Sequence, residues 1–69
     1  MKAILEFDLP EEQVEHRTAL DGVKWLSVCE ELDQWLRSLA KYENRDTVSV
    51  EEVRAKIREE MEAEGLSFD

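Results

Sequence analysis

The strongest structural signal in this sequence is the stretch VKWLSVCEELDQWLRSLAKY, residues 23–42. Its apolar residues recur at alternating steps of three and four, in two overlapping rows: Trp25, Cys29, Leu32, Leu36 and Leu39; and Val28, Leu32, Trp35, Leu39 and Tyr42. At 100° per residue these positions, together with Leu26 and Ala40, cover roughly 200° of a helix, about twice the apolar width that a surface helix needs. We therefore predict a helix over 23–42 that is central to the domain, buried on a second side by another chain, or both.

The residues at the N-terminus, MKAILEFDL, alternate between apolar and polar. Ala3, Leu5 and Phe7 fall on one side, and Lys2, Ile4, Glu6 and Asp8 on the other, which predicts a β-strand over 2–8 with one buried face. Ile4 is an exception on the polar side, which a partner covering part of that second face would explain. No second strand is predicted, and an unpaired strand edge tends to recruit another chain. We therefore expect this strand to pair antiparallel with its own copy in a homodimer.

A short helix is predicted between this strand and residues 23–42. Asp8, Pro10 and Glu11 form a helix-start signature, because Asp caps well, Pro suits the first turn and Glu can complete a capping box. The helix would run over 11–20 and end at Asp21-Gly22, where glycine can adopt the left-handed conformation.

A third helix is predicted over 50–64, after a loop at 43–46. Thr47 or Ser49 would cap it, and Ser49 with Glu52 matches a capping box. Gly65 would end it, and Leu66 and Phe68 would fold back as apolar plugs. The fold class is thus mainly helical α+β, in the order β-α-α-α, as a single domain over 1–69.

Charge and composition exclude several function classes. The chain has 69 residues and a net charge of −9, which disfavours direct binding to nucleic acid or to an anionic membrane. No apolar run approaches the roughly 20 residues of a membrane span. One cysteine, Cys29, and the absence of a signal peptide suggest a reducing cytoplasm; Cys29 itself is expected to be a small buried apolar residue.

The sequence shows no catalytic, cofactor or metal signature. His16 has only Glu12 and Glu15 nearby, too few ligands for structural zinc, and is expected on the solvated surface. Glu30 and Glu31 fall on the polar side of the predicted helix over 23–42, as solvated carboxylates. We predict no enzyme, no cofactor and no metal.

Two sets of residues are candidates for partner binding. The first is a partner or dimer interface: Ile4, Glu6, Val28, Trp35 and Tyr42. Aromatic residues at the edge of an apolar face are enriched in interfaces, although Trp35 and Tyr42 could equally shield the core. The second is an acidic face: Glu52, Glu59 and Glu62. Basic residues interrupt it at Arg54, Lys56 and Arg58, which weakens any mimicry of nucleic acid.

Two longer segments, MKAILEFDLPEE at 1–12 and ELDQWLR at 31–37, resemble a family of small uncharacterised proteins of tailed bacteriophages and prophages. The closing residues 52–54, 57–58 and 65–67 are similar too. Family members carry an aromatic near 15–16, where this chain has Glu15-His16. The resemblance implies a phage origin and action in the host bacterial cytoplasm, and it transfers no catalytic residue.

The favoured function is a non-enzymatic phage accessory protein. It would bind a phage or host protein and modulate host or phage nucleic-acid machinery. One alternative is an acidic nucleic-acid mimic that inhibits a defence or replication protein. Another is a structural subunit of a larger phage complex. Salt separates the first two, because an acidic mimic loses affinity steeply as salt rises and an apolar interface does not.

Overall fold

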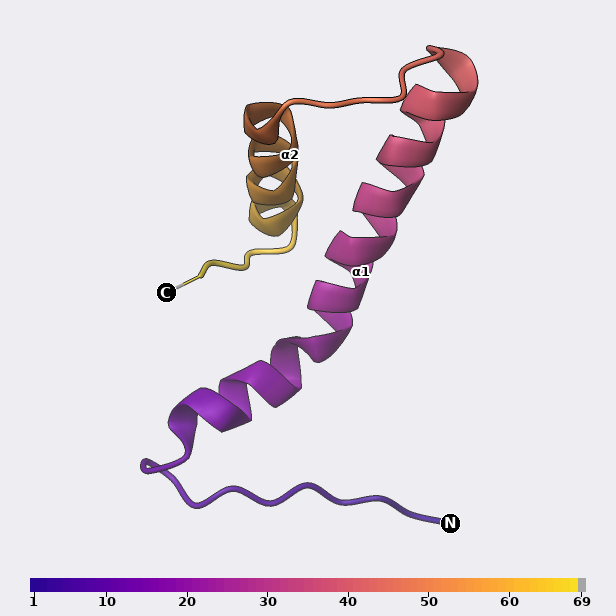
Figure 1. The fold of residues 1–69 in the computed structure, drawn as a ribbon. Coiled ribbons are helices and arrows are strands. Elements are labelled where there is room, and N and C mark those ends of the chain that lie inside the picture. Colours follow the sequence, from indigo (N-terminus) through magenta and orange to yellow (C-terminus); the bar gives the residue numbers. More distant parts are fainter. Residues whose placement is uncertain (69) are drawn as a thin grey trace.

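The computed structural model describes residues 1–68 and contains two helices within them. Helix α1 spans Gln13–Tyr42 and α2 spans Val50–Ala63. A loop over 43–49 reverses the chain, so that α2 runs back antiparallel along the second half of α1 (Figure 1). The predicted α+β class is wrong, because the described chain forms no β-strand and therefore no sheet.

The predicted strand over 2–8 is an extended, exposed segment. Ile4 and Leu5 are both largely exposed, and the segment runs away from the helices (Figure 1). A strand needs a neighbour for its backbone N–H and C=O groups, and the described chain supplies none. The alternating pattern thus indicates which side chains would share a face of a strand, but it does not supply the second strand to which the backbone would hydrogen-bond.

The two helices predicted over 11–20 and 23–42 are one continuous helix. Gly22 lies within α1, in helical rather than left-handed conformation. An interior glycine costs a helix only about 1 kcal/mol, which is too little to end it when both flanks are good helix formers. Asp21 contributes to continuity by pairing with Lys24 at 3.8 Å, one turn on.

The start of α1 also differs from the prediction. Residues 8–12 form a turn in which the Glu12 N–H donates to the Asp8 carbonyl at 2.8 Å. The Asp8 N–H donates in return to Glu12 Oε1 at 3.1 Å. Helix α1 then begins at Gln13, with no side-chain cap on its first turn.

Helix α2 begins and ends as predicted. The Glu52 N–H donates to the Ser49 hydroxyl at 3.0 Å, and the Ser49 N–H donates to Glu52 Oε1 at 3.1 Å, so the capping box is complete. At the other end Gly65 has φ 72°. The Leu66 N–H donates to the Met61 carbonyl at 2.8 Å, which closes a Schellman motif.

The core between the helices is small. Val28, Met61 and Leu66 form its buried centre, with Trp25, Leu32 and Ile57 packed around them. The burial of Leu66 confirms it as an apolar plug. Phe68 stays exposed but stacks on Trp25, with ring centroids 6.1 Å apart.

Candidate protein-interaction surfaces

The structure does not gather the five predicted interface residues on one surface. Ile4 and Glu6 lie in the exposed N-terminal segment, whereas the exposed Tyr42 ends α1 at the opposite end of the molecule (Figure 1). Val28 is only 3% exposed, inside the core. A partner could therefore touch Tyr42 or Ile4, but not Val28 without opening the fold.

Trp35 is half-buried where α2 crosses α1. The Lys56 Nζ of α2 lies 5.9 Å from the centroid of its indole ring, within the range of a cation–π contact. This placement favours the role of core shield over that of partner contact. Truncating Trp35 would consequently disturb the packing of α2, so the residue is a poor probe of binding.

Cys29 is exposed, which corrects the expectation that it is buried. Helix α2 covers the side of α1 that carries Val28, Leu32 and Leu39, and Cys29 points about 100° away from Val28. His16 is half-buried because the Phe7 ring lies against it, with centroids 5.3 Å apart. Neither residue has neighbours that suggest catalysis.

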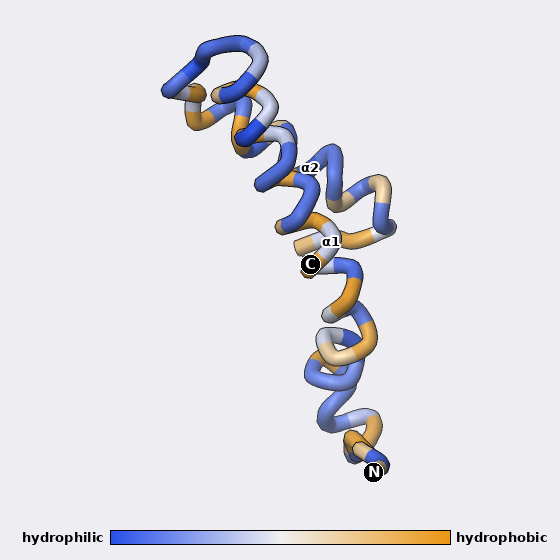
Figure 2. The backbone as a smooth tube through the Cα atoms, turned by 90° about the vertical axis from the view of Figure 1, so that its right-hand side faces the viewer, coloured by the Kyte–Doolittle hydropathy of each residue, from blue (hydrophilic) through white to orange (hydrophobic). Residues whose placement is uncertain are grey.

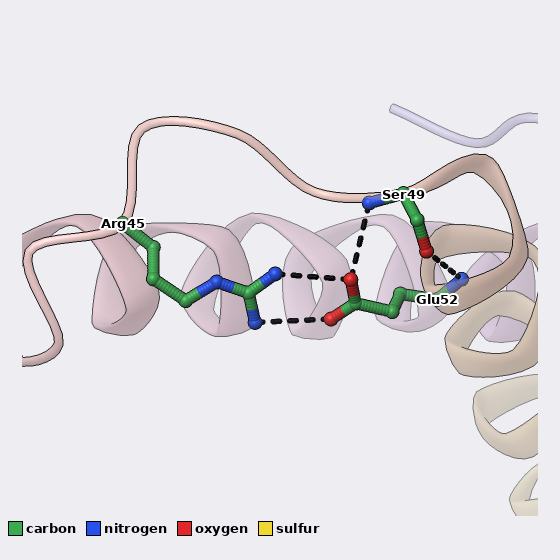
Figure 3. A network of polar contacts seen from close by, with 3 residues as sticks. All are labelled: Arg45, Ser49 and Glu52. Atoms are coloured by element: carbon green, nitrogen blue, oxygen red, sulfur yellow. Dashed lines mark hydrogen bonds and ion pairs between the residues drawn. The ribbon is translucent and has the colours of Figure 1, made fainter.

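The predicted acidic face is partly neutralised within the chain. Figure 3 shows Arg45, from the loop, contacting both oxygens of the Glu52 carboxylate. Its Nη1 lies 2.9 Å from Glu52 Oε2, and its Nη2 donates to Glu52 Oε1 at 3.0 Å. The hydrogen bonds from Arg45 and from the Ser49 backbone lower the pKa of Glu52 to about 2. Lys56 lies 3.8 Å from Glu59 and 3.2 Å from Glu60. Of the three predicted carboxylates only Glu62 has no such partner among the described residues.

The first three turns of α1 form a surface that the sequence analysis missed. Helix α1 has 30 residues and α2 only 14, or about 45 Å against about 21 Å of length. Figures 1 and 2 both show the beginning of α1 extending past the end of α2. Val14, Leu20 and Val23 on these turns remain exposed.

A groove lies between these turns and the N-terminal segment. We call it the N-terminal groove; its volume is about 590 Å³, and its lining includes Leu9, Pro10, His16, Arg17, Leu20 and Lys24. Its lining also includes Asp21, which pairs with Lys24 at 3.8 Å, so Arg17 is the one lining basic side chain with no ion pair found among the described residues. Sequence reasoning could not find it, because a helix ending at Gly22 would leave no projecting arm.

Metal-binding groups and membrane-spanning helices are not found among the described residues. They contain no group of three or more potential metal-ligating side chains. Neither helix is long and apolar enough to cross a membrane. The chain matches no protein-family model, no curated protein and no solved structure.

Proposed function

We propose that this chain is a non-enzymatic phage accessory protein that acts in the host bacterial cytoplasm by binding other proteins. Its partners are a second copy of itself and a phage or host protein, and the outcome is modulation of host or phage nucleic-acid machinery. The observation that carries the proposal is the uncovered first half of α1 with its N-terminal groove.

An uncovered helix of this length calls for a partner on energetic grounds. Isolated helices shorter than about 12–15 residues are marginal in water, and most helical stability in proteins comes from packing an apolar face. Residues 13–24 have no packed α2 beside them and contain an interior glycine. A protein that inserts an apolar side chain beside Leu20 would supply the missing packing.

The acidic-mimic alternative has less support. A mimic needs dense and uncompensated carboxylates, whereas Arg45 binds Glu52 and Lys56 lies near Glu59. Val14, Leu20 and Val23 on α1 instead expose apolar side chains. Partner binding is thus expected to persist as salt rises, as an apolar contact does.

The test is partner capture from phage-infected bacterial cells on immobilised full-length chain, quantified by mass spectrometry at low and high salt. Leu20→Glu places a charge in the N-terminal groove and should abolish specific capture. Val50→Glu is the matched control, because Val50 is similarly exposed but lies on α2, far from the groove. Capture that survives Leu20→Glu, or that vanishes at high salt with the wild-type chain, would overturn the proposal.

A further inference from the structure

A second apolar row runs along α1, on a side that α2 does not cover. We call this row the outer seam: Gly22, Leu26, Cys29, Asp33, Leu36 and Ala40. All six are exposed, with Leu26 at 58% and Leu36 at 41%. Their spacing of 4, 3, 4, 3 and 4 is the heptad spacing with which helices pack in coiled coils.

The outer seam is symmetric about Glu31. In an antiparallel pair of α1 helices with a two-fold axis at this level, Leu26 of one copy faces Leu36 of the other. Gly22 faces Ala40, and no heavy atom lies within 4 Å of the place where a Gly22 Cβ would stand, so the backbones can approach closely. Cys29 faces Asp33, and the two Asp33 carboxylates do not meet. A helix whose seam matches itself in this way is suited to an isologous contact.

A hollow beside the outer seam could accommodate an apolar side chain of the second copy. It measures about 210 Å³, and its walls include Leu36, Leu39 and Ala40 together with the loop residues 45–48. In the antiparallel arrangement this hollow lies next to the Leu26 side chain of the other copy.

The exposed surface is also larger than that of a compact monomer of the same mass. The chain exposes 6154 Å², whereas a compact monomer of its mass exposes about 4,500 Å². The excess of about 1,700 Å² is roughly twice the 800 Å² that each partner buries in a standard interface. Likewise its radius of gyration is 16.2 Å, against about 11 Å for a compact chain of this length and about 14 Å for twice the length.

We infer that the outer seam is covered by a second copy of this chain, as an antiparallel α1–α1 pair whose two-fold axis crosses the seam at the level of residue 31 along the helix. This inference deepens the proposed function, because it names the surface and geometry of self-association and leaves the N-terminal groove for the other protein. Asp33 in the seam is the main cost, since a charge at such a position weakens a helix pair.

The first test uses sedimentation equilibrium of the full chain over a dilution series. Leu26→Glu should weaken the dimer by about tenfold or more, since it removes an apolar contact twice per dimer. Leu20→Glu is the matched control: it makes the same change on the same helix at a similar exposure of 67%, outside the seam. We expect it to change the dissociation constant by no more than about twofold.

A second test uses substitutions that are expected to strengthen the dimer rather than weaken it, so a loss of the fold would not produce the expected result. Asp33→Leu should tighten the dimer by about tenfold, while Gln34→Leu, about 120° around α1 from the centre of the outer seam, should not. Under mild oxidation Asp33→Cys should give disulfide-linked dimers through Cys29 of the other copy, and Gln34→Cys should not. Added salt should also tighten the dimer, because it screens repulsion between two chains of net charge −9.

A chain that stays monomeric at all concentrations would overturn this inference. So would a dimer that ignores both Leu26→Glu and Asp33→Leu. These outcomes would remove the second copy from the proposed partners but leave the proposed binding of a phage or host protein standing, because that binding depends on Leu20 in the N-terminal groove. Conversely, loss of partner capture would not affect the behaviour of the outer-seam variants in sedimentation.

Discussion

Arg45 and Glu52 face each other across the start of α2, the guanidinium holding the carboxylate through two contacts of 2.9 and 3.0 Å. The same carboxylate also accepts the Ser49 N–H at 3.1 Å. Glu52 thus ties the loop to the capping box of α2 (Figure 3).

The first prediction is a pH dependence that belongs to Glu52. Its pKa falls from 4.5 to about 2 in the folded chain, chiefly through the Arg45 hydrogen bond. Because the pKa of Glu52 is lower in the folded than in the unfolded chain, the ionised carboxylate stabilises the fold at every pH above the pKa of the unfolded chain. That stabilisation is lost as the pH falls from about 4.5 towards 2. Thermal unfolding followed by circular dichroism at pH 7, 5, 4, 3 and 2 should show this loss in the wild-type chain.

The control for this prediction compares two variants with equal charge. Glu52→Gln should lower the melting temperature at pH 7 and flatten its decline below pH 4.5. Glu62→Gln removes one negative charge from the same helix, where no ion pair is found among the described residues, and should keep the wild-type profile. Parallel profiles for the wild-type chain and Glu52→Gln would show that the Arg45 contact does not stabilise the fold.

The second prediction concerns the Ser49 cap. Ser49→Ala removes the hydroxyl that accepts the Glu52 N–H at 3.0 Å, and loss of such a cap costs about 1 kcal/mol. In a chain of this size that lowers the melting temperature by about 4–8 °C. Ser38→Ala is the control, because the exposed Ser38 hydroxyl only donates to the Gln34 carbonyl within α1. Equal losses in both variants would contradict a capping role.

How far the sequence predicts this fold depends on what each signal measures. The capping box at Ser49 and the glycine stop at Gly65 are complete within a few neighbouring residues, so they were predicted correctly. The strand over 2–8 was wrong because pairing depends on a neighbour that no local pattern reports. The prediction that a helix ends at Gly22 was wrong because the residue type alone does not determine the φ angle of a glycine, and Gly22 is helical.

The candidate sites follow the same division. The hydrophobic periodicity identified Val28 and Trp35 as residues of a packed face, but it could not tell packing against α2 from packing against another protein. The engagement of Glu52 by Arg45 was missed because Arg45 comes from a loop. The N-terminal groove follows from α1 being one long helix with a shorter partner, and Cys29 is exposed because it points about 100° away from the side of α1 that α2 covers.

The third prediction makes the same substitution at two glycines and expects opposite signs. Gly22→Ala should stabilise the fold by about 0.5–1 kcal/mol, because Gly22 is helical and nothing lies within 4 Å of the added Cβ. Gly65→Ala should destabilise it by about 1–2 kcal/mol, because φ is 72° there and a Cβ strains that conformation. Urea unfolding of both variants, at a concentration at which sedimentation shows them to be monomeric, provides the measurement. Destabilisation by Gly22→Ala would indicate that α1 breaks at this position after all.

The fourth prediction tests the size of the core. Met61 is 3% exposed and packs with Val28 and Leu66. Truncating a buried Met to Ala typically costs about 2–5 kcal/mol. A core with so few buried side chains has little stability to spare, so Met61→Ala should detach α2 from α1 rather than merely soften the packing.

Hydrogen exchange resolves that detachment by region. In Met61→Ala the amides of α2 should lose protection and Trp25 fluorescence should shift towards that of a solvated indole, because its neighbours Leu66 and Phe68 leave with α2. Val50→Ala, at an exposed position of the same helix, should leave both signals close to those of the wild-type chain. Substitutions at such surface positions change the free energy of unfolding by no more than about 0.5 kcal/mol. Unchanged protection of α2 in Met61→Ala would mean that the Arg45–Glu52 link and the loop, rather than this core, hold α2 in place.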